Sequence, residues 1–399
     1  MSKTMGCDSI HPSVLKHCAD CLTSPITSLF NLSLALCRIP QEWKVHRIRP
    51  IPKSGDKLLV SNYCPISFLC VTSNVLEKLV YNKIIDFVTP KLSKNQFGFS
   101  KGKSCLSQLL LSYEQIYKEM DRGAKFDTIF LDFKKAFDSV LHNVLLNKFW
   151  RLGITGDLWL WFKEYLTQRL HYVQIDQTPS SLLPVKSGVP QGSILGPLLF
   201  LIYINDLPTC IDYATCYLFA DDVKLLKSIY SLNDCSLLQQ DLSSLQQWCN
   251  ASLLTVNQSK CTHLQMSLST RGSQYNHHYS ICETPLVEVT NQRDLAVFVS
   301  CNLSWSTHYS RMCQKAYGAL NLIKRYLPAN ASISLKKHLY IVLVRSHLSY
   351  CSQLWKPYLV KDITCLERVQ RRSTKFILNN YTADYKSRLR SLHLLPIML

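Results

Sequence analysis

Two short apolar segments that carry aspartates place the strongest constraint on this fold. The first, Phe126–Phe133, is rich in β-branched and aromatic residues and holds Asp132 near its end. The second, Tyr217–Leu226, has apolar residues on both sides of the pair Asp221-Asp222. Such compositions favour a buried strand and a hairpin with acids at its tip. If the two are neighbours in one sheet, the three carboxylates converge.

Convergent carboxylates support a specific chemistry. In nucleotidyl transfer, two divalent cations about 3.5–4 Å apart activate the attacking 3′-oxygen and stabilise the leaving pyrophosphate. Mg²⁺ takes oxygen ligands, usually one or two carboxylates together with substrate phosphates. Taken singly, Asp132 could cap a helix, and Asp221-Asp222 could be an ordinary turn dipeptide. The acids form a candidate metal site only in combination with the segments around them.

Helical and extended patterns alternate along the chain. The segment Arg47–Pro52 and a hairpin-like region up to Val185 are strand-like. Apolar residues at helical spacing predict helices before Leu36 and at 71–88, 104–121, 143–152, 158–166, 194–204, 237–253 and 365–378. Helices dominate the last third of the chain. The pattern predicts an α+β fold followed by a helical domain.

The charge distribution favours a polyanionic partner. The formal net charge is +18, and residues 311–390 contain 16 Lys and Arg against three Asp and Glu. A concentrated basic excess is typical of nucleic-acid binding, although a solvated surface kept for solubility would have the same composition. In the helix predicted at 365–378, four basic residues lie opposite the apolar face, namely Arg368, Arg371, Arg372 and Lys375.

Cysteine usage and hydropathy indicate the compartment. The 17 cysteines have no framework spacing and no secretory signal is visible, so we expect reduced thiols in the nucleus or cytoplasm. His17 and Cys18-x-x-Cys21 have no second pair at zinc-finger spacing, and a helix is the better interpretation. The apolar run 194–204 is too short, and is broken by proline, so we expect no transmembrane segment.

Several motifs occur in a fixed order. They are Asp-Phe-Lys-Lys-Ala-Phe-Asp at 132–138, Ser-Gly-Val-Pro-Gln-Gly-Ser-Ile-Leu-Gly-Pro at 187–197 and Phe-Ala-Asp-Asp at 219–222. Shorter ones are Pro-Ile-Pro-Lys at 50–53, Asn-Tyr-Cys-Pro-Ile-Ser at 62–67, Gln-Phe-Gly-Phe at 96–99 and Asn-Gln-Ser-Lys at 257–260. Over nearly the whole chain, this set resembles the reverse transcriptase of non-LTR (LINE-type) retrotransposons, most closely the jockey-like kind.

The resemblance implies a right-handed polymerase that copies RNA into DNA. An N-terminal helical extension would occupy residues 1–39 and the fingers 40–125. The palm would occupy 126–290, with a fingers insertion at about 140–185, and a helical thumb with the basic C-terminal region 291–399. Because no endonuclease segment precedes the fingers and no RNase H or Cys/His knuckle follows the thumb, we expect the chain to be part of a longer polyprotein.

The same resemblance assigns the catalytic residues. Asp132, Asp221 and Asp222 would bind two Mg²⁺ ions, which Mn²⁺ could replace. Lys260 would act as a general acid toward the leaving pyrophosphate, although it could also be an ordinary exposed lysine. Asp138 would be a helix-start acid rather than a third ligand.

The incoming deoxynucleoside triphosphate would meet a second set of residues. The backbone of Phe133 would face its phosphates, and the ring of Phe137 would exclude a 2′-hydroxyl. Pro190, Gln191 and Gly192 would lie beside the nucleotide and template, where glycine permits a close backbone approach.

Further residues would contact the triphosphate and the nucleic acid. Lys53 and Arg49 on the fingers would meet the triphosphate, unless they are simply solvated. Gln96 and Gly98 would line the template path. The basic thumb helix would bind the template–primer backbone through Arg368, Arg371, Arg372 and Lys375. The expected partners are therefore an RNA template, a DNA primer or target and deoxynucleoside triphosphates, with the oligomeric state left open.

Three positions depart from the family pattern. Cys64 stands where arginine is usual, Ser100 where a basic residue is common, and Ala296 where glycine is usual. A thiol cannot replace a charged bidentate donor, so we expect intact metal acids with weakened substrate binding. The alternatives are a decayed, non-catalytic nucleic-acid binder of the same ancestry and an RNA-dependent RNA polymerase. Phe137 argues against the second, because ribonucleotide use needs an open sugar pocket.

Overall fold

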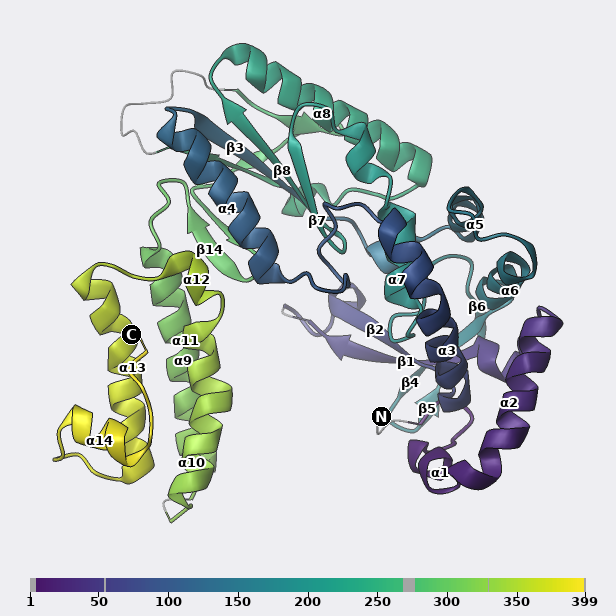
Figure 1. The fold of residues 1–399 in the computed structure, drawn as a ribbon, viewed down its shortest axis with the longest axis horizontal. Coiled ribbons are helices and arrows are strands. Elements are labelled where there is room, and N and C mark those ends of the chain that lie inside the picture. The colour runs from purple at the N-terminus through teal and green to yellow at the C-terminus, as the bar shows by residue number, and fades with distance from the viewer. Residues whose placement is uncertain (1–4, 54, 268–276, 329, 398–399) are drawn as a thin grey trace.

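A computed structural model describes residues 5–53, 55–267, 277–328 and 330–397 of the 399-residue chain. The chain passes from N-terminal helices at one end, through two sheets, to a group of C-terminal helices at the other end (Figure 1). Among the described helices, none combines the length and the apolar character needed to cross a membrane.

The larger sheet forms the centre of the molecule, with strand order β12-β9-β3-β8-β7. Strand β3 (Lys125–Leu131) is antiparallel to both β8 (Asp222–Ile229) and β9 (Thr262–Met266). The edges are β7 (Thr215–Phe219), antiparallel to β8, and β12 (Val287–Glu288), parallel to β9. The two segments predicted to carry the acids are therefore neighbouring strands, which meets the condition for their carboxylates to converge.

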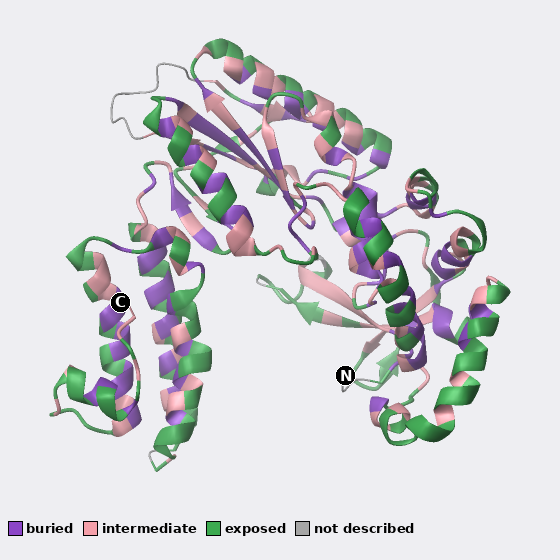
Figure 2. Ribbon diagram, in the orientation of Figure 1, coloured by how far each residue is buried: buried purple, intermediate pink, exposed green. Residues whose placement is uncertain are grey.

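Helices cover both faces of this sheet, because its strand residues alternate between two apolar clusters. Helix α4 (Cys105–Asp121) packs on β3, β7 and β8 and shares a cluster with Phe126 and Leu226. Helix α8 (Leu232–Ser252) covers the other face. Figure 2 shows the central strands as largely buried.

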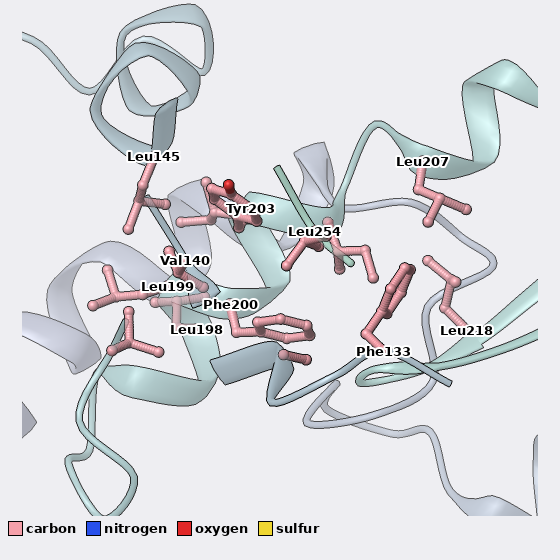
Figure 3. Close-up of a cluster of buried hydrophobic side chains, with 14 of the residues drawn as sticks. Phe133, Val140, Leu145, Leu198, Leu199, Phe200, Tyr203, Leu207, Leu218 and Leu254 are labelled. Atoms are coloured by element: carbon pink, nitrogen blue, oxygen red, sulfur yellow. The ribbon is translucent and has the colours of Figure 1, made fainter. Parts of the chain in front are cut away.

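A second apolar layer surrounds α7 (Gly196–Ile204), which is buried along almost its whole length. Phe200 and Tyr203 of this helix pack in one cluster with Phe133 and Leu218 of the central sheet region (Figure 3). This packing fixes the segment before α7 relative to the end of β3.

The smaller sheet lies beside the central one. Strand β1 (Val45–Pro52) is antiparallel to β2 (Tyr63–Phe68) and parallel to β4 (Leu170–Ile175). The short strands β5 (Thr178–Pro179) and β6 (Leu183–Pro184) each pair with β4 in the antiparallel direction.

The helices of this half are α1 (Pro12–His17), α2 (Ala19–Ala35), α3 (Val71–Val88), α5 (His142–Arg151) and α6 (Gly156–Leu166). Single 3₁₀ turns are η1 (Gln41–Lys44), η2 (Val60–Asn62), η3 (Thr89–Lys91), η4 (Ala136–Ser139), η5 (Leu207–Cys210) and η6 (Gln258–Lys260).

The last third is helical except at its start, where the structure contains strands that the sequence did not lead us to expect. Strands β13 (Asn291–Asp294) and β14 (Val297–Ser300) form a hairpin whose turn residues, Leu295 and Ala296, have φ of 42° and 71°. Four-residue strands carry too little alternation to be recognised in a sequence. Two further short strands, β10 (Ser280–Ile281) and β11 (Thr284–Pro285), pair with each other.

The helices that follow are α9 (Ser306–Tyr326), α10 (Ile333–Leu339), the π-helical η7 (Tyr340–Arg345), α11 (Ser346–Ser349), α12 (Ser352–Trp355), α13 (Val360–Leu378) and α14 (Tyr385–Ser391). Helix α13 packs against α9 and α14. The residue boundaries of fingers, palm and thumb stay predictions; α4, inside the range predicted for the fingers, packs on the central sheet.

Candidate active site

The register of the central sheet brings two of the predicted acids face to face. Leu131 of β3 pairs with Val223 of β8 in the antiparallel ladder. The next residues outward are Asp132, just past the end of β3, and Asp222, the first residue of β8. The two carboxylates therefore belong to adjacent strand ends.

The third acid sits in the turn of the β7–β8 hairpin. Because Phe219 pairs with Asp222, only Ala220 and Asp221 form the turn, and Ala220 has a φ of 55°. A two-residue turn with positive φ gives little backbone freedom, so the hairpin holds Asp221 and Asp222 at one fixed tip.

A segment far away in sequence braces this turn. Gln96 is 2% exposed; its Oε1 accepts from the Ala220 backbone N–H at 2.9 Å and its Nε2 donates to the Ala220 carbonyl at 3.3 Å. A Cβ added at Gly98 would lie 2.3 Å from the Ala220 nitrogen, so only glycine fits there. Sequence reasoning missed this brace. The template contacts expected of Gln96 and Gly98 stay predictions.

The carboxylates destabilise one another's charge. Loss of hydration, followed by the Asp221 and Asp132 carboxylates, raises the pKa of Asp222 to about 6. Loss of hydration and the Asp132 carboxylate also raise the pKa of Asp221, against the opposing effect of Lys260 and Lys53. This concentration of negative charge favours a cation between the acids.

Lys260 reaches the site from η6. Its Nζ lies 3.1 Å from Oδ2 of Asp132, and the lysine side chain is 62% exposed. The Asn257 backbone N–H donates to the Asp132 carbonyl at 2.7 Å, which ties the η6 segment to the end of β3. An exposed pair of this kind adds little stability, and the lysine remains accessible.

The segment before α7 is joined to the smaller sheet through Gln191. Its Nε2 donates to Oδ1 of Asp138 at 3.1 Å, and its Oε1 lies 3.3 Å from the Cys64 thiol. Its carbonyl accepts from the Ser67 N–H at 2.8 Å. Gly192 has a φ of 124°, and a Cβ there would lie 2.5 Å from the Ser67 carbonyl oxygen, so the tight approach requires glycine.

The aromatic residues of the site are partly core residues. Phe137 stacks on the buried Phe200 with ring centroids 4.4 Å apart, and the exposed Phe99 approaches its edge at 6.4 Å. Phe133 is 3% exposed and its side chain points into the core (Figure 3), which leaves only its backbone for other contacts. Pro190 is buried and its carbonyl accepts from the Ser193 N–H at 3.1 Å.

One buried acid was not singled out from the sequence. Glu77 of α3 is 1% exposed and accepts from the backbone N–H groups of Ile194 and Leu195 at 2.8 and 3.3 Å. The Tyr165 hydroxyl donates to it at 2.8 Å. This carboxylate holds the segment that follows Gly192. The available signal was the single glutamate of the helix predicted at 71–88, which follows the apolar Val75 and Leu76.

The two predicted fingers cations lie in different places. The charge of Lys53 opposes the raised pKa of both Asp221 and Asp138, so its ammonium lies within electrostatic range of these acids. Arg49 instead lines a separate pocket with Arg47 on the outer part of the smaller sheet. The structure therefore brings Lys53, but not Arg49, toward the acids.

The basic residues of α13 lie on the C-terminal helices, away from the acids (Figure 1). Arg368, Arg371 and Arg372 are exposed. The guanidinium of Arg372 lies over the Tyr317 ring of α9 at 5.7 Å, and that of Arg371 over the Tyr385 ring at 4.5 Å. Lys375 is half-buried and lies in the last turn of the same helix.

The donor set fits a divalent cation that also binds a substrate. Within the ranges that the structure describes, no three His, Cys, Asp or Glu side chains are grouped so that they alone could hold a metal ion. Mg²⁺ sites in phosphoryl-transfer enzymes need only one or two carboxylates, because substrate phosphates supply other ligands. Asp132, Asp221 and Asp222 provide hard oxygen donors of that kind.

The central sheet, the acid hairpin and the C-terminal helices define a polymerase of the right-handed type. Apo telomerase from Candida tropicalis has a similar fold, with a TM-score of 0.51 and 10% identity over 93% of this chain and 66% of that chain. The family model described as reverse transcriptase (RNA-dependent DNA polymerase) matches residues 51–283, more than half of the sequence, and the chain belongs to this family.

Curated relatives narrow the family to retrotransposon enzymes. The chain is 26% identical to the probable RNA-directed DNA polymerase from transposon BS of Drosophila melanogaster, over 98% of this chain and 47% of that protein. It is 30% identical to the RNA-directed DNA polymerase from mobile element jockey of the same species, over 70% of this chain and 32% of that protein. The resemblance to non-LTR elements is confirmed. The chain spans about half, or less, of the length of these relatives.

Proposed function

We propose that this chain is the RNA-directed DNA polymerase portion of a jockey-like non-LTR retrotransposon. It adds deoxynucleotides to a DNA 3′-end and copies an RNA template. The observation that carries the proposal is the convergence of Asp132 with Asp221 and Asp222 at one end of the central sheet. Membership of the chain in the reverse transcriptase family supports the same function.

The three carboxylates would hold two Mg²⁺ ions, or Mn²⁺ in their place. When bound, the ions activate the attacking 3′-oxygen and stabilise the charge on the leaving pyrophosphate. The carboxylates themselves orient the reacting groups, because the hairpin tip and the end of β3 are fixed by backbone pairing. The raised pKa values of Asp221 and Asp222 support cation binding, since a cation relieves their mutual repulsion.

Lys260 and Lys53 act on the triphosphate. Lys260 holds a proton at Nζ next to Asp132 and would donate it to the leaving pyrophosphate. The ammonium of Lys53, whose charge opposes the raised pKa of Asp221, would bind phosphate oxygens. Arg49 lines a different pocket, which does not include the acids, and it would contact phosphate only if the β1–β2 hairpin moved.

The sugar and base would lie between the two sheets. Gln191 is fixed by Asp138 and Ser67, and its segment with Pro190 and Gly192 would form the floor beneath the nucleotide. The Phe137 ring would contact the sugar where a 2′-hydroxyl would otherwise stand. The Phe133 backbone would face the phosphates.

The nucleic acid would extend toward the C-terminal helices. Residues Gln96 and Gly98 would lie near the template. Exposed arginines of α13 would contact the sugar-phosphate backbone, which makes binding sensitive to salt. The fingers, palm and thumb would divide at about residues 40, 126 and 291.

Primer extension on an RNA template with purified protein tests the function directly. We expect Mg²⁺-dependent incorporation of deoxynucleotides, abolished in the Asp221→Ala variant. Incorporation of ribonucleotides at an equal rate would instead identify an RNA-dependent RNA polymerase.

The sequence leaves open a second candidate, a nucleic-acid binder without catalysis, because Cys64 departs from the family pattern. The thiol lies next to Gln191 at the position where an arginine would grip the triphosphate. In that case the protein binds the RNA–DNA duplex with normal affinity, and neither wild type nor the Cys64→Arg variant extends the primer.

A further inference from the structure

Two cysteines from distant parts of the chain meet on the smaller sheet. Cys7 precedes α1, and Cys70 stands between β2 and α3, where it is the N-cap residue of the helix. Their sulfur atoms lie 3.6 Å apart, although the residues are 63 positions apart in sequence. A disulfide requires sulfur atoms about 2 Å apart, so a side-chain rotation would bring the two thiols into bonding distance.

The backbone around the two thiols is already in contact. A Cβ added at Gly6 would lie 2.5 Å from the Leu69 carbonyl oxygen and 2.7 Å from the Cys70 Cα, so only glycine permits this approach. Nη2 of Arg47 on β1 donates to the Met5 carbonyl at 2.8 Å and holds the same segment from the sheet. A bond between the thiols therefore needs no rearrangement of the chain.

The two thiols differ in access and in acidity. Cys7 is half-buried and lines a surface pocket with Asp8 and Tyr172, whereas Cys70 is fully buried. A hydrogen bond with Cys70 lowers the pKa of Cys7 to about 7, although loss of hydration and the Asp8 carboxylate act in the opposite direction. The same hydrogen bond and burial raise the pKa of Cys70 well above its usual value. Because the thiolate is the form that attacks an oxidant, Cys7 is the reactive member of the pair.

A second pair of cysteines provides an internal comparison. The sulfur atoms of Cys313 on α9 and Cys365 on α13 also lie 3.6 Å apart. Cys313 is 5% exposed, and loss of hydration, followed by the neighbouring Cys365, raises the pKa of Cys313 to about 12. This pair has the proximity of the first pair but lacks an accessible thiolate. The two pairs should therefore differ in reactivity.

We propose that Cys7 and Cys70 form a peroxide-responsive pair, which closes into a disulfide and fastens residues 5–8 to the junction of β2 and α3. The Cys7 thiolate attacks one oxygen of hydrogen peroxide, the O–O bond breaks, and the leaving hydroxide takes up a proton to become water. The Cys70 sulfur then attacks the sulfenic acid of Cys7, so that the S–S bond forms, the S–O bond breaks and a second water leaves with the Cys70 proton. The two thiols lose two electrons and the peroxide gains them. A thiol reductant reverses the reaction by exchange.

The disulfide would act on the support of the candidate active site. Cys70 joins two elements that hold the segment beside the acids. The Ser67 N–H of β2 donates to the Gln191 carbonyl, and Glu77 of α3 accepts from the Ile194 N–H. A covalent bond at Cys70 connects both elements to the N-terminal segment and closes a loop in the unfolded chain. Oxidation therefore stiffens this support.

Peptide mapping of the whole chain tests the proposal. The reduced protein is treated with hydrogen peroxide, the remaining thiols are alkylated at successive times, and disulfides are identified by mass spectrometry. We expect the Cys7–Cys70 disulfide to form at least about tenfold faster than a Cys313–Cys365 disulfide. In Cys70→Ser, Cys7 should accumulate as a sulfenic acid that dimedone traps, and in Cys7→Ser, Cys70 should stay reduced. Cys18→Ser removes an exposed thiol between the first two helices and, as the matched control, should change neither result.

Hydrogen exchange measures the consequence for the fold. Backbone amides of residues 5–10 and 64–72 should exchange more slowly in the oxidised wild-type protein, and dithiothreitol should restore the faster exchange. Unchanged exchange in the presence of the disulfide would contradict the fastening of the N-terminal segment.

Two further results would overturn the proposal. Equal rates for the two cysteine pairs would mean that proximity alone governs oxidation. An unoxidised Cys7 in the Cys70→Ser variant would mean that Cys7 is not the attacking thiol. The comparison of rates uses the wild-type chain, so it decides even if a variant fails to fold. None of these readouts involves primer extension, so a failure of the proposed polymerase function would leave them unaffected.

Discussion

The thiol of Cys64 lies 3.3 Å from Oε1 of Gln191, so a neutral side chain joins the smaller sheet to the segment that would support the nucleotide. Cys64 sits on β2, directly across from Ile51 of β1, and Lys53 follows at the end of the same hairpin. Lys53 is exposed, and its charge opposes the raised pKa of Asp221.

Replacing Cys64 with arginine should strengthen nucleotide binding. The guanidinium would add charged, bidentate hydrogen bonds to phosphate. Each such bond contributes about 1.5–3 kcal/mol of net free energy. We expect the KM for deoxynucleotides to fall by about tenfold in primer extension. Cys18→Arg adds the same charge on an exposed position of the N-terminal helices and should change nothing. Equal KM values for wild type and Cys64→Arg would contradict this interpretation.

Removing the Phe137 ring should relax the choice of sugar. The ring stacks on Phe200, so a smaller side chain opens space on the nucleotide side and keeps the core behind it. We expect Phe137→Val to raise ribonucleotide use relative to deoxynucleotide use by about tenfold, measured as the ratio of kcat/KM values. Phe149→Val, in the core of α5, should lower stability without changing the ratio. If both variants leave the ratio unchanged, Phe137 is a core residue only.

The metal-free protein should become more stable when Asp222 loses its charge. Its folded pKa is about 6, above the value of about 3.9 for an unfolded aspartate. Ionisation therefore costs stability as the pH rises from about 4 to about 6, and the cost persists above pH 6. In EDTA, Asp222→Asn should raise the melting temperature at pH 7.5 and have little effect at pH 4. The exposed Asp212→Asn is the control, and excess Mg²⁺ should reduce or reverse the gain.

Neutralising the basic face of α13 should weaken binding of an RNA–DNA duplex by a similar amount whatever the base sequence of the duplex. Removing one lysine or arginine from a phosphate reduces the slope of the logarithm of the binding constant against the logarithm of salt concentration by about 1. We expect Arg368→Gln/Arg372→Gln to raise the Kd for an RNA–DNA duplex and to flatten its salt dependence. Arg151→Gln/Lys163→Gln removes the same charge from α5 and α6, on the opposite side of the molecule (Figure 1). A flattened slope in the control pair as well would point to diffuse attraction instead of direct binding.

Local patterns predicted the elements that carry the acids. The β-branched segment before Asp132 and the apolar runs around Asp221 and Asp222 are strands, and both patterns reside within eight to ten residues of sequence. Helix α3 has the predicted bounds, Val71–Val88, because its apolar spacing is uninterrupted. Short-range periodicity is enough for such elements.

Features that depend on distant contacts could not be predicted in this way. The Gln96 brace joins residues 124 positions apart, and the buried ion pair of Lys224 and Asp294 joins residues 70 positions apart. Glu77 acquires its partners only when α3 meets the start of α7, 117 positions further along. None of these contacts can be recognised in a single sequence, because each of these polar residues, taken alone, is of a type that is common on protein surfaces.

The Gln96 and Gly98 brace changes how a damaged copy of such an element should be judged. The three aspartates are the residues by which an open reading frame would first be scored as intact. Yet the turn that aims Asp221 depends on an amide and a missing Cβ more than one hundred residues upstream. A copy with Gln96→Leu or Gly98→Ala would keep every acid and lose the geometry that makes them useful, so mutational decay could silence the enzyme while leaving its signature motifs untouched.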